Sequence, residues 1–384
     1  MRGIYVIGLG WCAGCGLSDV SALQDGGTTG GEVTGWMPHA EDQARPHLDL
    51  GEGMLDPYVP QREPEDRPDV TVYGYWPYWG ASLDTLAWDQ LTDLALFGVE
   101  LAADGSLTHQ DRWTDSAPLA MELAAPHEVR VHLTLICFSD EVMASVLPDP
   151  AKRAFTIAEV AALVNRYDAH GVNIDFEGLD TAYKHEFTAF VQEMSDAVED
   201  VVVAMPAIDW DGAYDYDELA FASDGLFIMG YGYHWSGGNP GPIAPLYGGG
   251  IWGAHSLVWT VEDYVKWGAP PDKIILGLPL YGRLWPTVDS GVPGDATGEG
   301  AAVTYSGAQA MVRDHTRRWD ATTETPYLLP SSDEQLWYDD AESLEAKMAY
   351  AVDGGLQGFG FWALTYEDTD PELWAMVDEL THLQ

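Results

Sequence analysis

The segment HGVNIDFEGLD, residues 170–180, places an amide and two carboxylates at alternating positions of a short apolar run. Residues two apart on a β-strand point to the same face, so Asn173, Asp175 and Glu177 would share one face. The other face holds only apolar side chains, namely Val172, Ile174 and Phe176. Two carboxylates fixed close together on a strand repel each other, so the pair indicates a functional site rather than a structural one.

Similar apolar runs recur after Val70 and are separated by helical patterns. They are VTVYGYWPYW (70–79), LTDLALFGVEL (91–101), VRVHLTLICF (129–138), GVNIDFEGL (171–179), VVVAMPAIDW (201–210), GLFIMGYGYHW (225–235), KIILGLPLYGRLW (273–285) and GFGFWALTYED (358–368). Eight strands alternating with helices predict an α/β fold, a (β/α)8 TIM barrel. An open doubly wound sheet is the alternative, but no Gly-rich phosphate loop follows the first run.

The helices between the runs carry their own signals. Thr156 and Glu159 have the spacing of a capping box, followed by an apolar face made of Ile157, Val160, Ala161 and Val164. The segment SLEAKMAYAVDGG predicts a helix that is closed by Gly354 or Gly355. Both patterns suit helices that pack against barrel strands.

In a barrel of this type, chemistry occurs where the strands end. Glu177, Tyr231, Arg283 and Trp362 would end strands four, six, seven and eight, and so would face one cleft. A short Gly-rich segment, 285–332, lies between strand seven and the last helix. It predicts a reduced insertion there and a shallow groove.

The chain is strongly acidic, with a formal net charge of −45 over 384 residues. A phosphate backbone or an anionic lipid surface would be repelled, so we expect no nucleic-acid partner. The acidity indicates either general solubility or adaptation to salty surroundings. The 11 His and 3 Cys residues show no metal-ligand spacing, so we expect no metal and no cofactor. Cys137 lies in an apolar run, which favours a buried thiol.

The N-terminal region divides into two parts. Residues 1–15 resemble a signal segment with a bacterial lipobox, in which Cys15 would be lipidated; an ordinary cleaved signal peptide is the alternative. Residues 16–69 are rich in Gly, Pro, Asp and Glu and predict an acidic disordered tether. Residues 70–384 would be the catalytic domain. We therefore expect a monomer that is secreted or held at the cell envelope, with a lipid anchor as its only membrane contact.

The segment HGVNIDFE resembles the strand-four signature of family 18 glycoside hydrolases, D-G-x-D-x-D-x-E, found in chitinases and related N-acetylglucosaminidases. Four further segments resemble the family in the right order: VYGYWPYW, MGYGYHW, GAPPDKIILGLPLYGR and GLQGFGFWAL. The strand-four sequence is closest to the branch that acts on bacterial cell-wall glycan, including spore-associated enzymes. The resemblance covers most of the chain after residue 70.

The resemblance implies a mechanism in which the substrate assists its own cleavage. Glu177 would be the general acid, with a pKa raised by its neighbour Asp175. The 2-acetamido oxygen of the sugar would attack the anomeric carbon, while Asp175 orients the acetamido N–H and Tyr231 donates its hydroxyl to the acetamido oxygen. Trp362 would form the apolar floor. Retention of configuration and a requirement for an N-acetyl group follow from this scheme.

The sequence departs from the family pattern at three positions. His170 and Asn173 replace the first two Asp residues of the signature, so Asn173 can support Asp175 only by hydrogen bonding. Gly232 replaces the carboxylate that follows the strand-six Tyr; Asp209 is the candidate to compensate. The remaining expected substrate contacts are Met229, Tyr75, Tyr281, Arg283 and Trp235.

The sequence therefore predicts a retaining glycoside hydrolase acting on β-1,4-linked N-acetylglucosamine polymers, either chitin oligomers or the glycan of peptidoglycan. Two alternatives stay open. One is a lectin-like protein that binds such oligosaccharides on the same barrel without turning them over. The other is a barrel hydrolase with two protein carboxylates, which would accept substrates without the acetamido group.

Overall fold

The computed structural model describes residues 70–368 and 370–381. The predicted lipobox with Cys15 and the predicted tether, 16–69, lie outside these residues. Within them, no helix is both long enough and apolar enough to cross a membrane.

Eight parallel strands close into the predicted barrel. Around the ring the strands follow the order β1-β14-β8-β7-β6-β5-β4-β2, with each strand paired to its neighbours. The β1–β2 pairing completes the ring. The short β3 adds antiparallel to β2. The bounds are β1 Thr71–Pro77, β2 Asp93–Leu101, β3 Leu107–Thr108, β4 Arg130–Cys137, β5 Gly171–Phe176, β6 Asp200–Pro206, β7 Gly225–Met229, β8 Ile274–Pro279 and β14 Gly358–Trp362.

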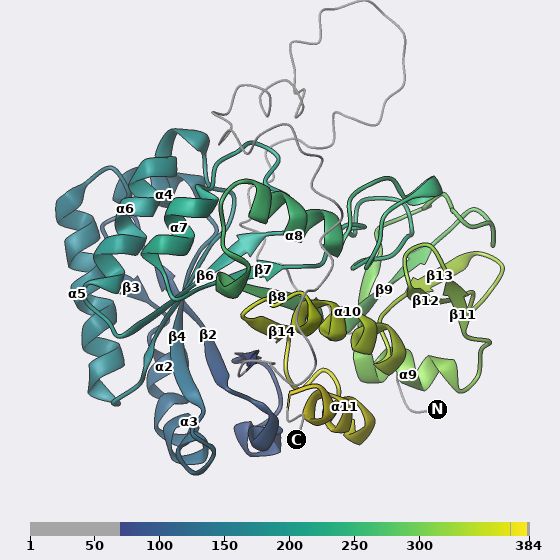
Figure 1. Ribbon diagram of the computed structural model, residues 1–384, viewed down its shortest axis with the longest axis horizontal. Helices are drawn as coiled ribbons and strands as arrows, with labels where there is room; N and C mark the ends of the chain where they lie inside the picture. The colour runs from purple at the N-terminus through teal and green to yellow at the C-terminus, as the bar shows by residue number, and fades with distance from the viewer. Residues whose placement is uncertain (1–69, 369, 382–384) are drawn as a thin grey trace, which may run out of the picture.

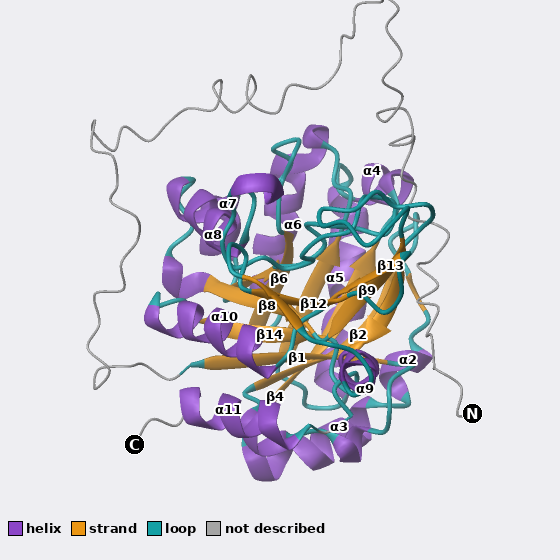
Figure 2. Cartoon of the chain, turned by 90° about the vertical axis from the view of Figure 1, so that its right-hand side faces the viewer, coloured by secondary structure: helices purple, strands orange, loops and turns teal. Residues whose placement is uncertain are grey.

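Helices cover the outside of this ring (Figures 1 and 2). They are α2 Asp111–Thr114, α3 Ala117–Ala124, α4 Asp140–Val146, α5 Pro150–Arg166, α6 Lys184–Ser195, α7 Tyr216–Ala222, α8 Leu257–Lys266, α10 Ala341–Asp353 and α11 Pro371–Thr381. The strands are buried on both faces, which is why they read as nearly continuous apolar runs. Gly354 and Gly355 follow α10 as expected.

The capping box expected at Thr156 is wrong. Helix α5 begins earlier, at Pro150, and the carboxylate of Asp149 accepts hydrogen bonds from the backbone N–H groups of its first turn. Asp at the N-cap followed by Pro at the first helical position is a strong start signal. Thr156 lies inside the helix, where its hydroxyl donates to the carbonyl of Gly105 at 2.8 Å.

The region after strand seven also differs from the prediction. Barrel strand β8 ends at Pro279, and the chain then enters a separate antiparallel sheet of five strands with the order β10-β9-β13-β12-β11. Tyr281 and Arg283 therefore belong to β9 and do not end a barrel strand. The elements of this insertion are β9 Tyr281–Pro286, β10 Ala301–Thr304, α9 Tyr305–Val312, β11 Arg318–Asp320, β12 Thr325–Leu328 and β13 Glu334–Trp337.

The insertion lies beside the barrel rather than forming a mere loop over it (Figure 1). It has a small apolar core of its own, formed by Val303, Ala308, Leu328, Leu336 and Tyr338. The glycines of this segment therefore accompany an ordered sheet, and the insertion has more structure than its composition indicated.

Candidate active site

Asp175 and Glu177 lie at the carboxyl end of β5, as the sequence predicts. The N–H of Glu177 donates to the carbonyl of Cys137 at 3.1 Å, which extends the β4–β5 pairing to the acid residue. Asp175 is 4% exposed, whereas Glu177 is only partly buried and can be reached from solvent. The strand therefore holds one carboxyl inside the barrel and presents the other at its rim.

The electrostatics of this pair favour retention of a proton at neutral pH. Burial raises the pKa of Glu177 to about 7. Burial and then the charge of Glu177 raise the pKa of Asp175 well above its ordinary value. Ionising both carboxyls would place like charges together in a poorly solvated site, so the pair retains a proton more readily than two isolated carboxyls would.

Asn173 lies one step deeper on the same face, opposite Thr134 of β4 in the strand register. Its amide donates to the carbonyl of Val202 at 3.3 Å, so the side chain is fixed in orientation. Asn173 Oδ1, Asp175 Oδ1 and Thr134 Oγ1 are buried and have no hydrogen-bond partner among residues 70–368 and 370–381. The barrel interior beneath the acid pair is therefore polar.

Tyr231 and Tyr281 form the next part of the site. Tyr231 follows β7, and its ring meets that of Tyr281 edge-on at 6.1 Å between centroids. Burial raises the pKa of Tyr231 well above its ordinary value, with smaller contributions from Tyr75, Tyr281 and both carboxylates. Its hydroxyl is therefore held as a hydrogen-bond donor close to the acid pair.

Arg283 reaches this group from the insertion. It is 7% exposed, and its Nη1 donates to the carbonyl of Gly300 at 2.8 Å. Burial raises the pKa of Tyr281 to about 12, and the nearby guanidinium opposes that effect. The structure thus brings Arg283 and Tyr281 to the site from β9, rather than from barrel strand seven.

An aromatic wall surrounds Trp362 at the end of β14. The ring of Trp362 contacts Tyr75 at 5.5 Å and Phe97 at 4.8 Å between centroids. Met229, partly buried, packs against the same interior cluster. Trp362, Met229 and Tyr75 are therefore brought together as expected.

Sequence reasoning missed three aromatic members of this wall. Trp79 packs edge-on against Phe97 at 5.8 Å, and Phe138 stacks on Phe97 at 6.5 Å. Phe97 belongs to β2, and Trp79 and Phe138 follow β1 and β4. The rule that site residues gather where barrel strands end could have identified all three.

Asp209 does not stand in for the carboxylate absent at Gly232. Its two carboxylate oxygens accept hydrogen bonds from the N–H groups of Ala213 and Tyr214, at 3.0 and 2.9 Å. The Tyr214 hydroxyl in turn donates to the carbonyl of Phe176 at 2.7 Å, directly before the catalytic-face Glu177. Asp209 thus holds the loop that braces the end of β5.

Trp235 and Gly232 lie on the long segment between β7 and α8. Trp235 is 47% exposed, and its ring covers Gly237, where a Cβ would come within 2.3 Å of it. Gly232 has φ of +81°, and a Cβ there would meet no atom within 4 Å. Open space therefore lies next to Tyr231 at the position where the family has its second acid.

The far end of the barrel holds a different charged cluster. Asp93, His132 and Asp200 are buried with their potential ligand atoms within 4.8 Å of one another. Arg130 already provides a cation there, since Nε lies 2.8 Å from Asp93 and Nη1 lies 3.1 Å from Asp200. This cluster closes the barrel floor through ion pairs.

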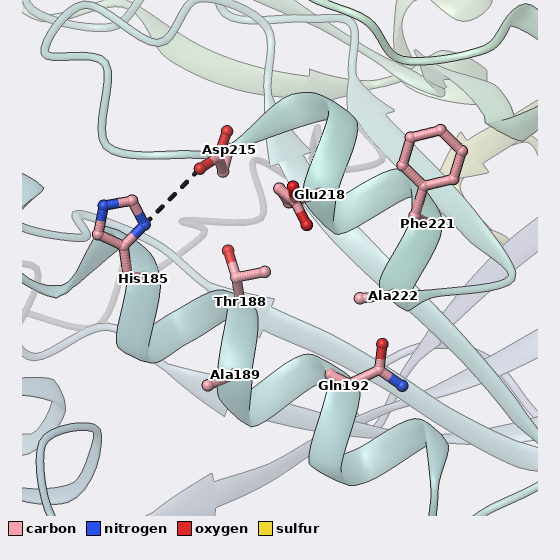
Figure 3. Close-up of a pocket in the computed structure, with 8 residues that line it drawn as sticks. All are labelled: His185, Thr188, Ala189, Gln192, Asp215, Glu218, Phe221 and Ala222. Carbon is pink, nitrogen blue, oxygen red and sulfur yellow. Dashed lines mark ion pairs between the residues drawn. The ribbon is translucent and has the colours of Figure 1, made fainter.

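A pocket of about 380 Å³ lies on the outside of the barrel, between α6 and α7 (Figure 3). His185 and Asp215 form an ion pair of 3.8 Å at one end of it, and the ring of Phe221 is 72% exposed at the other. It is lined by side chains of α6 and α7 and by Asp215, the N-cap of α7, and it is separate from the acid pair.

Cys137, on β4, is a buried free thiol as expected, and burial raises its pKa to about 11.

Comparison with known proteins agrees with this geometry. The chain is 27% identical over 292 residues to a putative sporulation-specific glycosylase, YdhD, of Bacillus subtilis, with 71% of this chain and 66% of that protein covered. It is 24% identical to the cortical fragment-lytic enzyme of Bacillus subtilis, over 63% of this chain and 57% of that protein. A probable endochitinase of Caenorhabditis elegans is 28% identical, over 60% of this chain and 42% of that protein. The matches therefore span at most about two thirds of these relatives' length.

Solved structures share the fold. The crystal structure of a GH18 chitinase from Cycas revoluta in complex with (GlcNAc)3 aligns with a TM-score of 0.74 at 22% identity, covering 81% of this chain and 99% of that one. The Group IV chitinase of Ostrinia furnacalis aligns with a TM-score of 0.75 at 19% identity, covering 82% and 100%. The model of the family described as glycosyl hydrolases family 18 matches residues 71–367. The chain therefore belongs to glycosyl hydrolases family 18.

Proposed function

We propose that this chain hydrolyses β-1,4-linked N-acetylglucosamine glycans with retention of configuration and with participation of the substrate's acetamido group. The observation that carries the proposal is the placement of Asp175 and Glu177 two residues apart at the end of β5, where burial raises the pKa of both carboxyls. A carboxyl whose pKa is about 7 can be protonated at neutral pH and can also act as a base after the proton is given away.

The position of the two carboxyls supports substrate assistance over a two-carboxylate mechanism. Asp175 lies on β5 and Glu177 directly follows the strand, where its N–H continues the pairing with β4. The two side chains are two residues apart and so approach the sugar from the same side. A protein nucleophile would need to lie across the anomeric carbon from the acid. When the acetamido oxygen attacks, the substrate itself occupies that opposite position, so no protein nucleophile is needed there.

Each remaining group then has a defined task. Glu177 protonates the glycosidic oxygen and later activates water. Asp175 turns toward the acetamido N–H and stabilises the positive charge that develops on the ring formed by the acetamido oxygen. Tyr231 donates a hydrogen bond to the acetamido group, and Trp362 supports the apolar face of the sugar. Asn173, fixed by Val202, supports Asp175 by hydrogen bonding without adding charge.

The substrate class is inferred from the family and from the positions at which this chain differs from the family pattern. Relatives include a putative sporulation-specific glycosylase and cortical fragment-lytic enzymes as well as a probable endochitinase. The uncharged Asn173 and the open space at Gly232 reduce negative charge beside the sugar, and so suit the glycan of peptidoglycan, which carries acidic sugars, at least as well as chitin. We therefore propose both as substrates to be compared.

Hydrolysis of fluorogenic N-acetylglucosamine oligomers by the full chain tests the proposal, with Glu177→Gln as the inactive variant. Glu345→Gln is a matched control, because Glu345 is exposed on α10. Wild type and the control should turn over the substrate, while Glu177→Gln should not. Equal inactivity of all three across pH and salt would contradict an enzymatic role.

The second candidate is a protein that binds such oligosaccharides without cleaving them. Asn173 and Gly232 favour it, because each removes a carboxylate of the family pattern. Calorimetry that shows tight binding of oligomers that stay intact would support this candidate. Cleavage of cellobiose-type substrates, which lack the acetamido group, would support a two-carboxylate mechanism instead.

Export to the cell envelope remains part of the proposal. It rests on the N-terminal segment with Cys15. Mass spectrometry of the mature N-terminus would distinguish a lipidated Cys15 from a freely secreted chain.

A further inference from the structure

Arg283 is a buried cation without a carboxylate partner. Its side chain is 7% exposed, and none of the ion pairs in the described part of the chain includes it. Its Nη1 donates to the carbonyl of Gly300 at 2.8 Å, whereas its Nε is buried and has no hydrogen-bond partner among the described residues. A buried charge is unfavourable unless an opposite charge compensates it, so this guanidinium has the capacity to bind an anion.

Other arginines show how this chain usually treats such a charge. Arg153 is buried to nearly the same degree, at 8% exposed, and pairs with Glu193 at 2.7 Å. Arg317, which is more exposed, pairs with Asp340 at 2.7 Å. With 62 acidic and only 17 basic residues in the chain, a carboxylate partner is readily supplied from within the protein. Arg283 differs in keeping its charge for a ligand.

Arg283 lies beside the acid pair, next to Tyr281. The two residues are two positions apart on β9 and so share a face of that strand. Burial raises the pKa of Tyr281 to about 12, the guanidinium of Arg283 lowers it, and the charge of Glu177 raises it. The ring of Tyr281 also meets that of Tyr231 at 6.1 Å between centroids. The guanidinium therefore belongs to the same site as the catalytic acid.

Open space lies in this part of the site, at Gly232. The residue follows Tyr231 and has φ of +81°, and a Cβ there would meet no atom within 4 Å. The N–H of Gly300 donates to the carbonyl of Ser236 at 2.8 Å, in the same segment after β7, while the carbonyl of Gly300 accepts from Arg283. The segment with the open space and the guanidinium are therefore joined through one residue.

The chemistry of the guanidinium selects the class of substituent. Its planar fork of N–H donors matches a carboxylate better than a hydroxyl or an amide oxygen. Of the two proposed substrate classes, chitin is neutral. In the glycan of peptidoglycan, every second amino sugar carries a lactyl ether at O3, which ends in a carboxylate. This substituent adds both the volume and the charge that the site accommodates.

We propose that Arg283 is a specificity-determining residue that binds the lactyl carboxylate of an N-acetylmuramic acid unit, and that the open space at Gly232 admits this substituent. The inference rests on the proposed function, because it states which of the two proposed substrate classes is preferred. It adds that a glycan with alternating N-acetylglucosamine and N-acetylmuramic acid binds more tightly than a chitin oligomer of the same length.

Binding to an uncleaving protein tests this preference. The full chain carrying Glu177→Gln is titrated by calorimetry with chitin hexamer and with a peptide-free peptidoglycan hexamer. The peptidoglycan hexamer should bind about tenfold more tightly, as one hydrogen-bonded charge pair implies, and conversion of its carboxylates to methyl amides should remove the difference. Added Arg283→Gln should bring the ratio of the two affinities close to one, whereas Arg283→Lys keeps the charge and should retain part of the preference.

Gly232→Asp is an independent variant, and Gly232→Asn is its matched control. Asp and Asn have the same size and are the side chains that best tolerate positive φ, but only Asp offers Arg283 a carboxylate from within the protein. Gly232→Asp should therefore abolish the preference for the peptidoglycan hexamer, and Gly232→Asn should retain it. An equal ratio of affinities in these two variants would contradict the role of Arg283.

Two results would overturn the inference while leaving the proposed function intact. One is an unchanged ratio of affinities after Arg283→Gln in a variant with an unchanged unfolding temperature. The other is tighter binding of a hexamer that alternates N-acetylglucosamine with a uronic acid, whose carboxylate is on the ring, than of the peptidoglycan hexamer. Absence of binding of every hexamer, together with absence of hydrolysis by wild type, would contradict both proposals.

Discussion

Replacing Glu177 by Gln should stabilise the protein, with a gain that begins above pH 4.5 and reaches its full size near pH 7. Burial raises the pKa of Glu177 from 4.5 to about 7, so the folded protein keeps this proton over a pH range in which the unfolded chain releases it. The stability linked to this group is complete below pH 4.5 and is lost as pH rises to about 7. Gln cannot ionise and avoids that loss.

The magnitude follows from the shift. The pKa of Glu177 rises from 4.5 to about 7. At about 1.4 kcal/mol per pKa unit, folding disfavours the charged carboxylate by about 3 kcal/mol. Glu177 is partly open to solvent, and screening should reduce the effect to about 2 kcal/mol. Release of Asp175 from its charged neighbour acts in the same direction, because Glu177 is one cause of the raised pKa of Asp175.

Denaturant unfolding of wild type and Glu177→Gln measures this difference at about pH 4 and about pH 8. The variant should match wild type at the lower pH and exceed its free energy of unfolding by about 2 kcal/mol at the higher pH. Glu345→Gln, on the surface, should show no such pH dependence. A Glu177→Gln variant that is less stable than wild type at about pH 8 would refute the reasoning about a buried, proton-retaining carboxyl.

Three further predictions concern activity, packing and salt. Because Glu177 must be protonated to act as the acid, kcat/KM of wild type should fall as pH rises above about 7, and a flat profile through pH 9 would contradict this role. Tyr231→Phe should lower kcat on the order of 10²-fold with an unchanged unfolding temperature, since it removes one donor to the acetamido group; unchanged kcat would exclude that contact. In the full chain, at a net charge of −45, added NaCl should raise the unfolding temperature by screening repulsion, and a constant melting temperature up to molar salt would remove the idea of salt adaptation.

The barrel and its acid pair could be predicted from the sequence because both depend on local patterns. Strands buried on both faces are continuous apolar runs. Asp175 and Glu177 are easy to recognise in HGVNIDFE because they are charged residues at alternating positions of such a run. The ends of β1, β2 and β4 carry aromatic residues inside ordinary apolar runs, where they do not stand out from core residues. Trp79, Phe97 and Phe138 are those residues.

The remaining differences arise from long-range contacts or from competing local signals. Thr156 and Glu159 have capping-box spacing, but Asp149 and Pro150 start the helix first. Nothing local to the run 273–285 reveals that its second half leaves the barrel. Arg283 is placed by pairing of β9 with β10 and β13, strands that lie far along the chain and have no distinctive pattern of their own.

Proton NMR of the first sugar product tests the central claim most directly. The full chain is mixed with an N-acetylglucosamine hexamer, and the anomeric signal of the new reducing end is followed before mutarotation. The account predicts the β-anomer from wild type, no product from Glu177→Gln, and no cleavage of a hexamer whose acetamido groups have been removed. Formation of the α-anomer, or equal cleavage of the deacetylated hexamer, would contradict it.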